Sequence, residues 1–246
     1  MSKVRYLIGD EDKDSVIRGM KKYLEKKQEL DKFLEKLISP LIKNKSLKIL
    51  DACCGVGHII YHLSKISPKS QFVGIDKKDY LIKEARTLFS PEQSNIVFKI
   101  SDVYKLSKYF KKKFDITLNW KTLSWLPDYK KIMEEMIKVT KKCIFLSSLF
   151  YEGDIDFEIK VREYKTENGK KSFNAYYNVY SLPRFKDFCR KLGAKRIKVY
   201  NFEMPVDLPR PSLNRMGTYT VKLKNGKRLQ ISGVVLMNWK IIKIEL

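Results

Sequence analysis

The chain has 246 residues, 43% of them hydrophobic, and a formal net charge of +23 at neutral pH. This length is enough for one sizeable α/β domain with a large core, and no apolar run approaches the roughly 20 residues that a membrane-spanning helix needs. The N-terminus lacks the long apolar stretch of a secretory signal and the four cysteines show no metal-binding spacing, so we expect a cytoplasmic protein with free thiols.

The positive charge does not by itself indicate a nucleic-acid-binding protein. Basic residues are spread along the whole chain, and arginine, the usual choice for bidentate phosphate and base contacts, supplies only 10 of the 51. A lysine-rich bias of this kind resembles that of AT-rich bacteria. Basic residues that are spread along the sequence can still lie together in the folded protein, so a polyanion-binding face stays an alternative.

The first predicted element is helical. Apolar residues recur every three or four positions over residues 11–43, which predicts a helix broken once, and Pro40 should limit or kink its second part. This segment is either a lid over a ligand or a helix packed on the sheet.

From residue 47 onward, strand and helix patterns alternate, which is typical of a parallel sheet with right-handed crossovers. We expect strands at 47–51, 71–76, 95–100, 114–119 and 143–149, and helices at 58–66, 78–89, 103–112 and 128–141.

The junction after the first of these strands carries the clearest functional signal. Residues 51–57 read DACCGVG, an acid followed by a glycine turn that lets backbone N–H groups approach a ligand closely. Asp76 follows Gly57 by 19 residues and ends the next strand, a position from which an acid typically binds ribose hydroxyls. A nicotinamide dehydrogenase would need a third glycine, which is missing here.

Polar residues recur at the ends of the predicted strands. Ligands of parallel α/β sheets bind beyond the carboxyl ends of the strands, so these side chains should meet at one rim. They are Asp51, Asp76, Asp102 and Asn119.

After Phe150 the pattern changes. We expect a polar hairpin over 155–180 with its turn at 167–170, a helix at 182–192, a strand at 195–203, a proline-rich loop at 205–211, and a second hairpin that pairs 217–223 with 228–235.

These motifs resemble those of class I S-adenosylmethionine (SAM)-dependent methyltransferases. Residues 51–57 match the family's first motif, commonly DLGCGTG, with Cys53 in place of the first glycine. Asp76 matches the ribose-binding acid, residues 101–103 resemble the adenine-contact segment, and residues 114–120 resemble the fourth strand. The resemblance is good over about 45–150 and loose over 180–246.

The resemblance implies an α/β fold with a doubly wound, mostly parallel seven-stranded sheet, an N-terminal helical cap and antiparallel hairpin insertions. We predict a single domain over 1–246, with the cap at 1–45, the cofactor-binding core at 46–150, and a substrate-side insertion with the C-terminal strands at 151–246.

The resemblance also implies SAM as the cofactor and S-adenosylhomocysteine (SAH) as its product. Asp76 would accept two ribose hydroxyls, and Asp51 would favour the cationic end or fix the turn. Asp102 would either accept from the adenine amine or cap the helix that begins at Val103. The expected cofactor-binding residues are Asp51, Cys53, Gly55, Gly57, His58, Asp76, Lys77, Asp102, Val103 and Asn119.

Methyl transfer is an in-line displacement that depends mainly on positioning, and it needs a base only where the acceptor must lose a proton. The two histidines, His58 and His62, lie four residues apart with no third ligand in view, so no metal is expected. The catalytic candidates are Asn119, Tyr151 and Asp154, the last two of which also fit ordinary solvated loop residues.

The acceptor is less well defined than the cofactor. Residues 119–122 read NWKT, without the prolines that often mark methylation of nucleobase amino groups, and Cys143 falls in a buried strand, which does not fit a cytosine-C5 nucleophile. Aromatic side chains could wall a small-molecule pocket, and arginines could hold an anionic group. The substrate-binding candidates are Trp120, Trp125, Tyr177, Arg210 and Arg215.

The predicted function is therefore methyl transfer to an O or N atom of a small molecule, such as an anionic metabolite or a cell-surface polysaccharide precursor. The alternatives are an RNA methyltransferase (tRNA or rRNA) that uses the basic surface, and a non-catalytic cofactor-binding protein.

Overall fold

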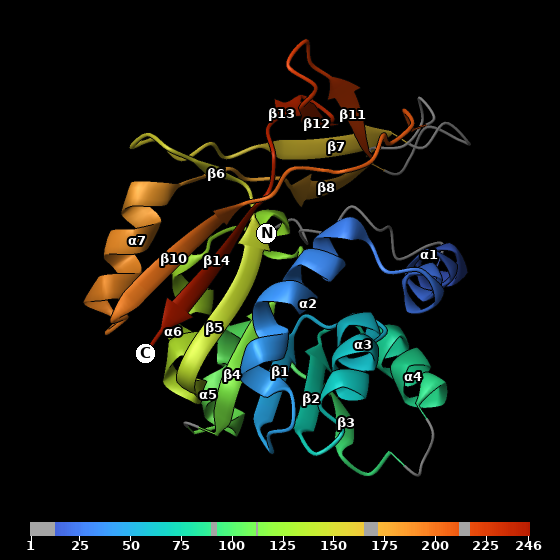
Figure 1. The fold of residues 1–246 in the computed structure, drawn as a ribbon, viewed down its shortest axis with the longest axis vertical. Coiled ribbons are helices and arrows are strands. Elements are labelled where there is room, and N and C mark those ends of the chain that lie inside the picture. Colours follow the sequence, from blue (N-terminus) through green and yellow to red (C-terminus); the bar gives the residue numbers. More distant parts are fainter. Residues whose placement is uncertain (1–12, 90–92, 112, 165–171, 212–216) are drawn as a thin grey trace.

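The computed structural model describes residues 13–89, 93–111, 113–164, 172–211 and 217–246 (Figure 1). A seven-stranded sheet with the strand order β10-β14-β5-β4-β1-β2-β3 forms its centre. The strands β1 to β5 are parallel, whereas β14 runs antiparallel to both of its neighbours. The strands are β1 (Lys48–Ala52), β2 (Gln71–Asp76), β3 (Ile96–Ile100), β4 (Phe114–Asn119), β5 (Thr140–Ser148), β10 (Arg196–Asn201) and β14 (Lys240–Glu245).

Helices cover both faces of this sheet, which is why its central strands consist almost wholly of buried residues. One cluster of buried side chains lies under α2 (Glu29–Ile42), α3 (His58–Ile66) and α4 (Asp79–Leu88). A second cluster lies under α5 (Leu106–Tyr109), α6 (Lys130–Val139) and α7 (Leu182–Lys191). The predicted α/β class and seven-stranded sheet are confirmed.

The N-terminal segment forms two helices, as the sequence predicts. α1 (Lys13–Glu25) contacts α3 and α4, and an ion pair of 2.9 Å joins Lys21 to Glu84. α2 packs an apolar stripe onto the core, and Pro40 lies inside it without ending it, since the helix continues to Ile42. The predicted division of the chain into one domain with a cap, a core and an insertion stays a prediction.

Two boundaries differ from those expected. β5 begins at Thr140, inside the predicted helix, because the Thr140 hydroxyl hydrogen-bonds to Thr117 of β4 and to the Met136 carbonyl at the end of α6. The predicted helix at 103–112 is a 3₁₀ turn, η1 (Val103–Lys105), followed by the short α5.

Small antiparallel elements lie beyond the carboxyl ends of the central strands, at the top of Figure 1. In the first hairpin β7 (Lys160–Tyr164) pairs with β8 (Ser172–Tyr176), and a bridge between Phe157 and Val179 extends it, while its predicted turn at 167–170 lies outside the described residues. β6 (Phe150–Tyr151) pairs with β9 (Tyr180–Ser181). The second hairpin forms as predicted, from β11 (Thr218–Lys222) and β12 (Arg228–Ser232), followed by β13 (Val235–Leu236).

Candidate functional site

The turn after β1 is built from left-handed residues. The φ angles of Cys53, Gly55 and Gly57 are 69°, 57° and 83°. A Cβ at position 57 would lie 2.6 Å from the Phe98 ring, so only glycine fits there. Cys53 adopts this conformation with a side chain, at a cost of about 1–2 kcal/mol. Strain of this kind gathers at ligand sites.

Asp76 fixes the turn from the neighbouring strand. Its Oδ2 accepts a hydrogen bond of 3.0 Å from the Gly55 N–H, and its Oδ1 accepts one of 2.9 Å from the Lys78 N–H. Burial raises the pKa of this carboxyl, and the two backbone donors oppose that rise. A carboxylate has about four acceptor positions, so one remains on each oxygen for a pair of ribose hydroxyls.

The end of β3 adds further polar groups beside Asp76. Asp102 accepts a hydrogen bond of 3.0 Å from the Tyr104 N–H and so caps η1, while its Oδ2 lies 3.8 Å from the Lys77 ammonium. The Ser101 hydroxyl is buried and has no hydrogen-bond partner among the described residues. The capping role predicted for Asp102 is confirmed, and its second oxygen stays available to a ligand.

Asp51 and Asn119 lie below the turn. The Asn119 amide donates a hydrogen bond of 3.0 Å to the Ala52 carbonyl and thereby joins the end of β4 to that of β1. Asp51 is almost fully buried; burial, with the negative charge of Asp76, raises the pKa of Asp51 to about 7.

A buried polar cluster lies across the turn from Asp76. Asp31 of α2 accepts hydrogen bonds of 2.8 Å on its Oδ1 from the Trp120 indole and from the Lys121 ammonium, which also contacts Gln28. His58, the first residue of α3, places Nε2 3.7 Å from Asp31 Oδ2. Lys121 too has a left-handed backbone, with φ of 58°.

Burial and neighbouring charges shift the pKa values in this cluster. Burial works to raise the pKa of Asp31, but its polar neighbours, Lys121 first among them, together outweigh burial and hold that pKa below its ordinary value. Burial and the Lys121 charge lower the pKa of His58 to about 3. His58 is therefore neutral near pH 7, and its approach to Asp31 is not an ion pair. The two His58 nitrogens and Asp31 Oδ2 are buried without a hydrogen-bond partner among the described residues.

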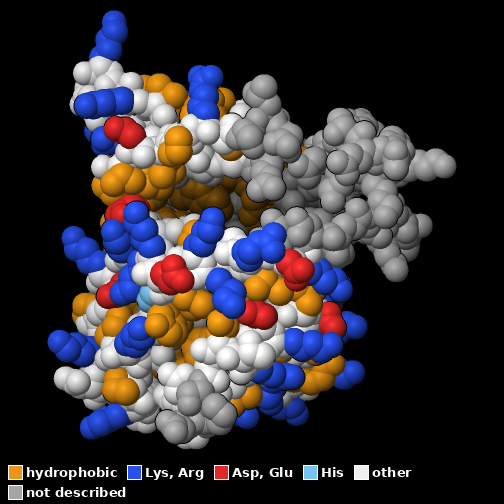
Figure 2. All heavy atoms as spheres, turned by 90° about the vertical axis from the view of Figure 1, so that its right-hand side faces the viewer, with side chains coloured by type: hydrophobic (Ala, Val, Ile, Leu, Met, Phe, Trp, Pro, Cys, Tyr) orange, Lys and Arg blue, Asp and Glu red, His pale blue; other side chains and the backbone are white. Residues whose placement is uncertain are grey.

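One cavity of about 1000 Å³ connects these features. Its near half is lined by the turn and the acidic strand ends, and α1 forms one wall through Val16, Met20 and Tyr23. Its far half, which we call the apolar compartment, is lined by Trp125, Phe202, Met204, Leu208 and Trp239. Figure 2 shows a hollow with apolar side chains between the main body and the upper part of the molecule.

The structure brings together only part of the predicted site. The cavity is lined by Cys53, Gly55, His58, Asp76, Lys77, Asp102, Val103, Trp120 and Trp125. Asp51, Gly57 and Asn119 lie next to it, and Tyr177 packs behind Trp125 with 4.4 Å between the ring centroids.

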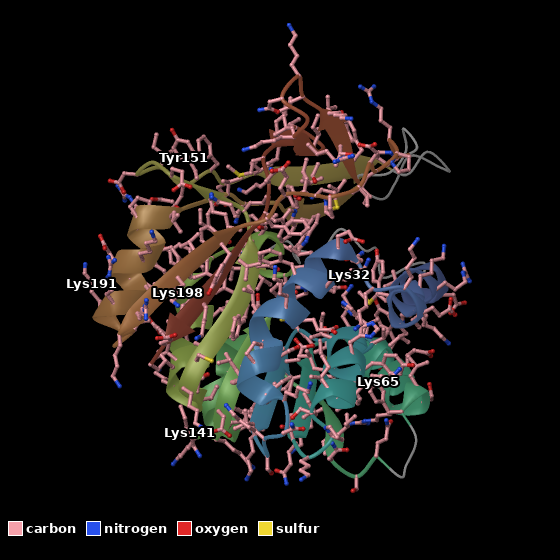
Figure 3. All side chains as sticks on the ribbon, viewed as in Figure 1. Lys32, Lys65, Lys141, Tyr151, Lys191 and Lys198 are labelled. Carbon is pink, nitrogen blue, oxygen red and sulfur yellow. The ribbon has the colours of Figure 1, made fainter. Side chains whose placement is uncertain are left out.

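Other predicted residues lie elsewhere. Tyr151 projects from the outer surface on β6 (Figure 3), and the exposed Asp154 pairs with Arg184 at 2.6 Å. The exposed Arg210 lies over the Tyr219 ring, 5.1 Å from its centroid, and Arg215 lies outside the described residues.

A family model described as "Methyltransferase domain" matches residues 43–184, more than half of the chain. The chain belongs to this methyltransferase domain family. With the strand order found above, the predicted class I SAM-dependent methyltransferase is confirmed, and SAM is the cofactor.

The methyltransferase is also similar to characterised proteins over part of its length. It is 28% identical over 93 residues to the malonyl-[acyl-carrier protein] O-methyltransferase of Bacillus anthracis, which covers 38% of this chain and 33% of that protein. It is 30% identical over 97 residues to the demethylmenaquinone methyltransferase of Lactococcus lactis, with 39% and 38% covered. The matched segment thus spans about a third of the length of these relatives.

Solved structures share the fold at low sequence identity. A chain in the complex of the Haloferax volcanii Trm112 methyltransferase activator with a methyltransferase has a TM-score of 0.59 and 13% identity, over 97% of this chain and 98% of that one. The YcgJ protein of Bacillus subtilis has a TM-score of 0.56 and 13% identity, over 85% and 96%. Among the described residues of this methyltransferase, no helix is both long and apolar enough to cross a membrane.

Sequence reasoning missed the polar cluster and most of the apolar compartment. Asp31 carried a signal: it shares the buried stripe of α2 with Leu34, Ile38 and Ile42, where a charged residue needs a partner. No local motif marks the other residues of the compartment, because only the tertiary fold brings them to the end of β4. Phe202 and Met204 lie between β10 and β11, and Trp239 directly precedes β14.

Proposed function

We propose that this methyltransferase transfers the methyl group of SAM to an oxygen or nitrogen atom of a small molecule. The observation that carries the proposal is the single cavity that runs from the strained turn to the apolar compartment. Its volume of about 1000 Å³ lies at the upper end of small-molecule sites, so it has room for cofactor and acceptor together.

In this proposal the adenosine lies against the ends of β2 and β3. The two free acceptor positions of Asp76 hold the ribose hydroxyls, and the buried Ser101 hydroxyl and Asp102 Oδ2 face the adenine edge, beside the apolar Val103. The unpaired groups there fit a nucleoside because each gains the hydrogen bond it lacks in the free protein. The full proposed set is Asp51, Cys53, Gly55, Gly57, His58, Asp76, Lys77, Asp102, Val103 and Asn119.

The amino-acid end of SAM would face the polar cluster. Its carboxylate and ammonium match the buried Lys121 and Asp31, which pair with each other, and the unpaired atoms beside them, Asp31 Oδ2 and the two His58 nitrogens. The sulfonium methyl then points toward Trp120 and Trp125.

The reaction requires no covalent intermediate with the protein. The acceptor lone pair would form the new bond to the methyl carbon as the carbon–sulfur bond breaks. The electron pair of the broken bond would stay on the sulfur of SAH, and the methylated acceptor would lose a proton. The cavity lowers the barrier by positioning the acceptor against the methyl group and by excluding water.

The recessed acceptor side supports a small acceptor rather than RNA. Its apolar residues line a cavity, whereas nucleic-acid sites follow the phosphate backbone along an extended basic surface. We propose an anionic metabolite as the acceptor, ahead of a polysaccharide precursor, in a cytoplasmic bacterial setting.

The test is calorimetric titration of the full chain with SAH. We expect binding to the wild type and a loss of affinity of at least about tenfold in Asp76→Ala, the scale of one or two hydrogen bonds to a charged group. Asp187→Ala, which changes an exposed side chain of α7, is the matched control and should bind as the wild type does. No binding to the folded wild type, or equal binding by both variants, would refute the proposed site.

A further inference from the structure

The apolar compartment differs sharply in chemistry from the cofactor half of the cavity. It is built by three separate segments: η2 (Leu123–Trp125), the connection from β10 to β11, and the residue before β14. Leu208 is held in place by the Thr220 side chain, whose hydroxyl accepts a hydrogen bond of 2.8 Å from the Leu208 N–H. Trp125 is backed by the buried Tyr177 ring. Trp125 and Leu208 are therefore held in place by contacts outside the cavity.

The hydrogen-bonding side chains around this compartment are largely paired with each other. The Thr218 and Ser232 hydroxyls lie 2.7 Å apart, and the Trp120 indole is bound to Asp31. Gln230 accepts from the Trp239 N–H through its side chain. A sugar needs many hydrogen bonds from its pocket, and this wall offers few, so it selects an acceptor by apolar contact and ring stacking.

Positive charge stands at the mouth of the same cavity. Lys22 and Lys26, exposed at the end of α1, line it and have no carboxylate within ion-pair distance among the described residues. The lining acids of the acceptor side are neutralised: Glu29 pairs with Lys32 at 2.6 Å, and Asp207 with Arg228 at 2.7 Å. Lysine side chains line the lower lip of the hollow in Figure 2.

We propose that the acceptor is a flat, largely apolar ring compound that carries one anionic group. Its ring lies in the apolar compartment against Trp125 and Trp239, and its anionic group points to Lys22 and Lys26 at the mouth. The hydroxyl or amino group to be methylated then sits at the inner end of the ring, toward Trp120 and the cofactor. This inference rests on the proposed function, since it names the acceptor class of the same site.

The experiment compares three probes by calorimetry with the full chain saturated with SAH. The probes are 6-hydroxy-2-naphthoate, its neutral counterpart 2-naphthol, and glucose 6-phosphate as an anionic sugar. We expect the naphthoate to bind most tightly. Naphthol should bind at least about fivefold more weakly, because it lacks the carboxylate that contacts the two solvent-screened lysines. The sugar phosphate should not bind at 1 mM.

Two variants separate the ring contact from the charge contact. Lys22→Gln with Lys26→Gln should weaken the naphthoate about fivefold and leave naphthol unchanged. Trp125→Leu should weaken both ring probes about tenfold, the scale of a lost aromatic stack. The matched controls are Lys141→Gln with Lys191→Gln, exposed lysines away from the cavity (Figure 3), and Tyr151→Leu on the outer surface; none should change any affinity.

The outcomes distinguish this inference from the proposed function. If SAH binds but no ring probe does, or if the sugar phosphate binds better than the naphthoate, the acceptor class is wrong and the cofactor site stands. An equal effect of the lysine pair on naphthoate and naphthol also overturns it. If SAH itself fails to bind, the proposed function fails first.

Discussion

Cys53 shows at the scale of one residue where this chain departs from the glycine-rich form of its motif. The backbone there is left-handed, a conformation that glycine adopts without steric cost. We expect Cys53→Gly to keep or raise the free energy of unfolding, by up to about 1 kcal/mol. Gly57→Ala should lower it by well over 1 kcal/mol, because the new Cβ meets the Phe98 ring at 2.6 Å.

Urea denaturation of the two variants measures both effects. The opposite order, with Cys53→Gly the more destabilised, would mean that the thiol stabilises the turn more than its backbone strains it.

Asp51 should make stability depend on pH in an unusual direction. Its folded pKa of about 7 lies above the ordinary 3.8, so between these values the unfolded state gives up the proton first, and rising pH favours unfolding. The wild type should lose stability relative to Asp51→Asn from pH 4 to 7, by up to about 1.4 kcal/mol per pH unit, with no further change above 7.

Unfolding free energies of the two proteins, measured from pH 4 to 8, check this. Parallel pH profiles would show that Asp51 is ionised in the folded protein throughout. His58 adds the opposite effect on the acid side, because its lowered pKa removes stability as the pH falls below 6.5.

Sequence reasoning identified residues fixed by a local motif and missed those fixed by distant packing. Asp76 could be predicted because a strand end and a glycine turn at set spacing force it against Gly55. The bond from Lys121 to Asp31 joins residues 90 positions apart, so no local pattern marks it. Tyr151 was proposed on residue type alone, and the fold turns it outward.

α1 is the element whose role follows from the cavity. It contacts α3 and α4, its Tyr23 carbonyl lies 2.7 Å from His62 Nε2, and it forms a cavity wall. Of the two roles that the sequence left open, the lid over the ligand is the one we propose. A cofactor under this wall must be released before the helix can open, so the ligand should slow that opening.

Hydrogen–deuterium exchange tests the lid. With SAH at 100 times its dissociation constant, amides of 13–25 should exchange up to about a hundredfold more slowly, whereas those of α7 should not change. Equal protection of both helices would instead indicate general stabilisation, and no protection of α1 would remove it from the site.

The elements themselves were predicted unevenly. Strands such as 71–76 and 114–119 were placed correctly because they are short apolar runs bounded by turn residues. The first hairpin also lies where it was expected, since 160–164 pairs with 172–176 around the predicted turn, whereas the helix expected at 103–112 is only a 3₁₀ turn and the short α5.

For the molecule as a whole, cofactor binding should appear as thermal stabilisation. A ligand at 100 times its dissociation constant adds about 2.7 kcal/mol, which for a chain of this length raises the midpoint by roughly 5–10 °C. Differential scanning fluorimetry with SAH measures the shift. Asp76→Ala should lose most of it at the same SAH concentration, and a full shift in that variant would contradict the assignment of Asp76.

At the scale of the whole sheet, the resemblance predicted seven mostly parallel strands but not their order. Strand–helix alternation indicates a parallel sheet but leaves the order of strands open, and nothing in the apolar run at 240–245 marks it as the one antiparallel member of the central sheet.

The antiparallel β14 has a consequence for folding during synthesis. β14 is synthesised after β10 yet lies between β10 and β5, so β10 has no neighbour and β5 keeps an open edge until residues 240–245 emerge. Trp239, which directly precedes β14, reaches its place in the cavity at the same moment. A nascent chain can thus form the cofactor half of the cavity before residues 239–245 complete the acceptor half.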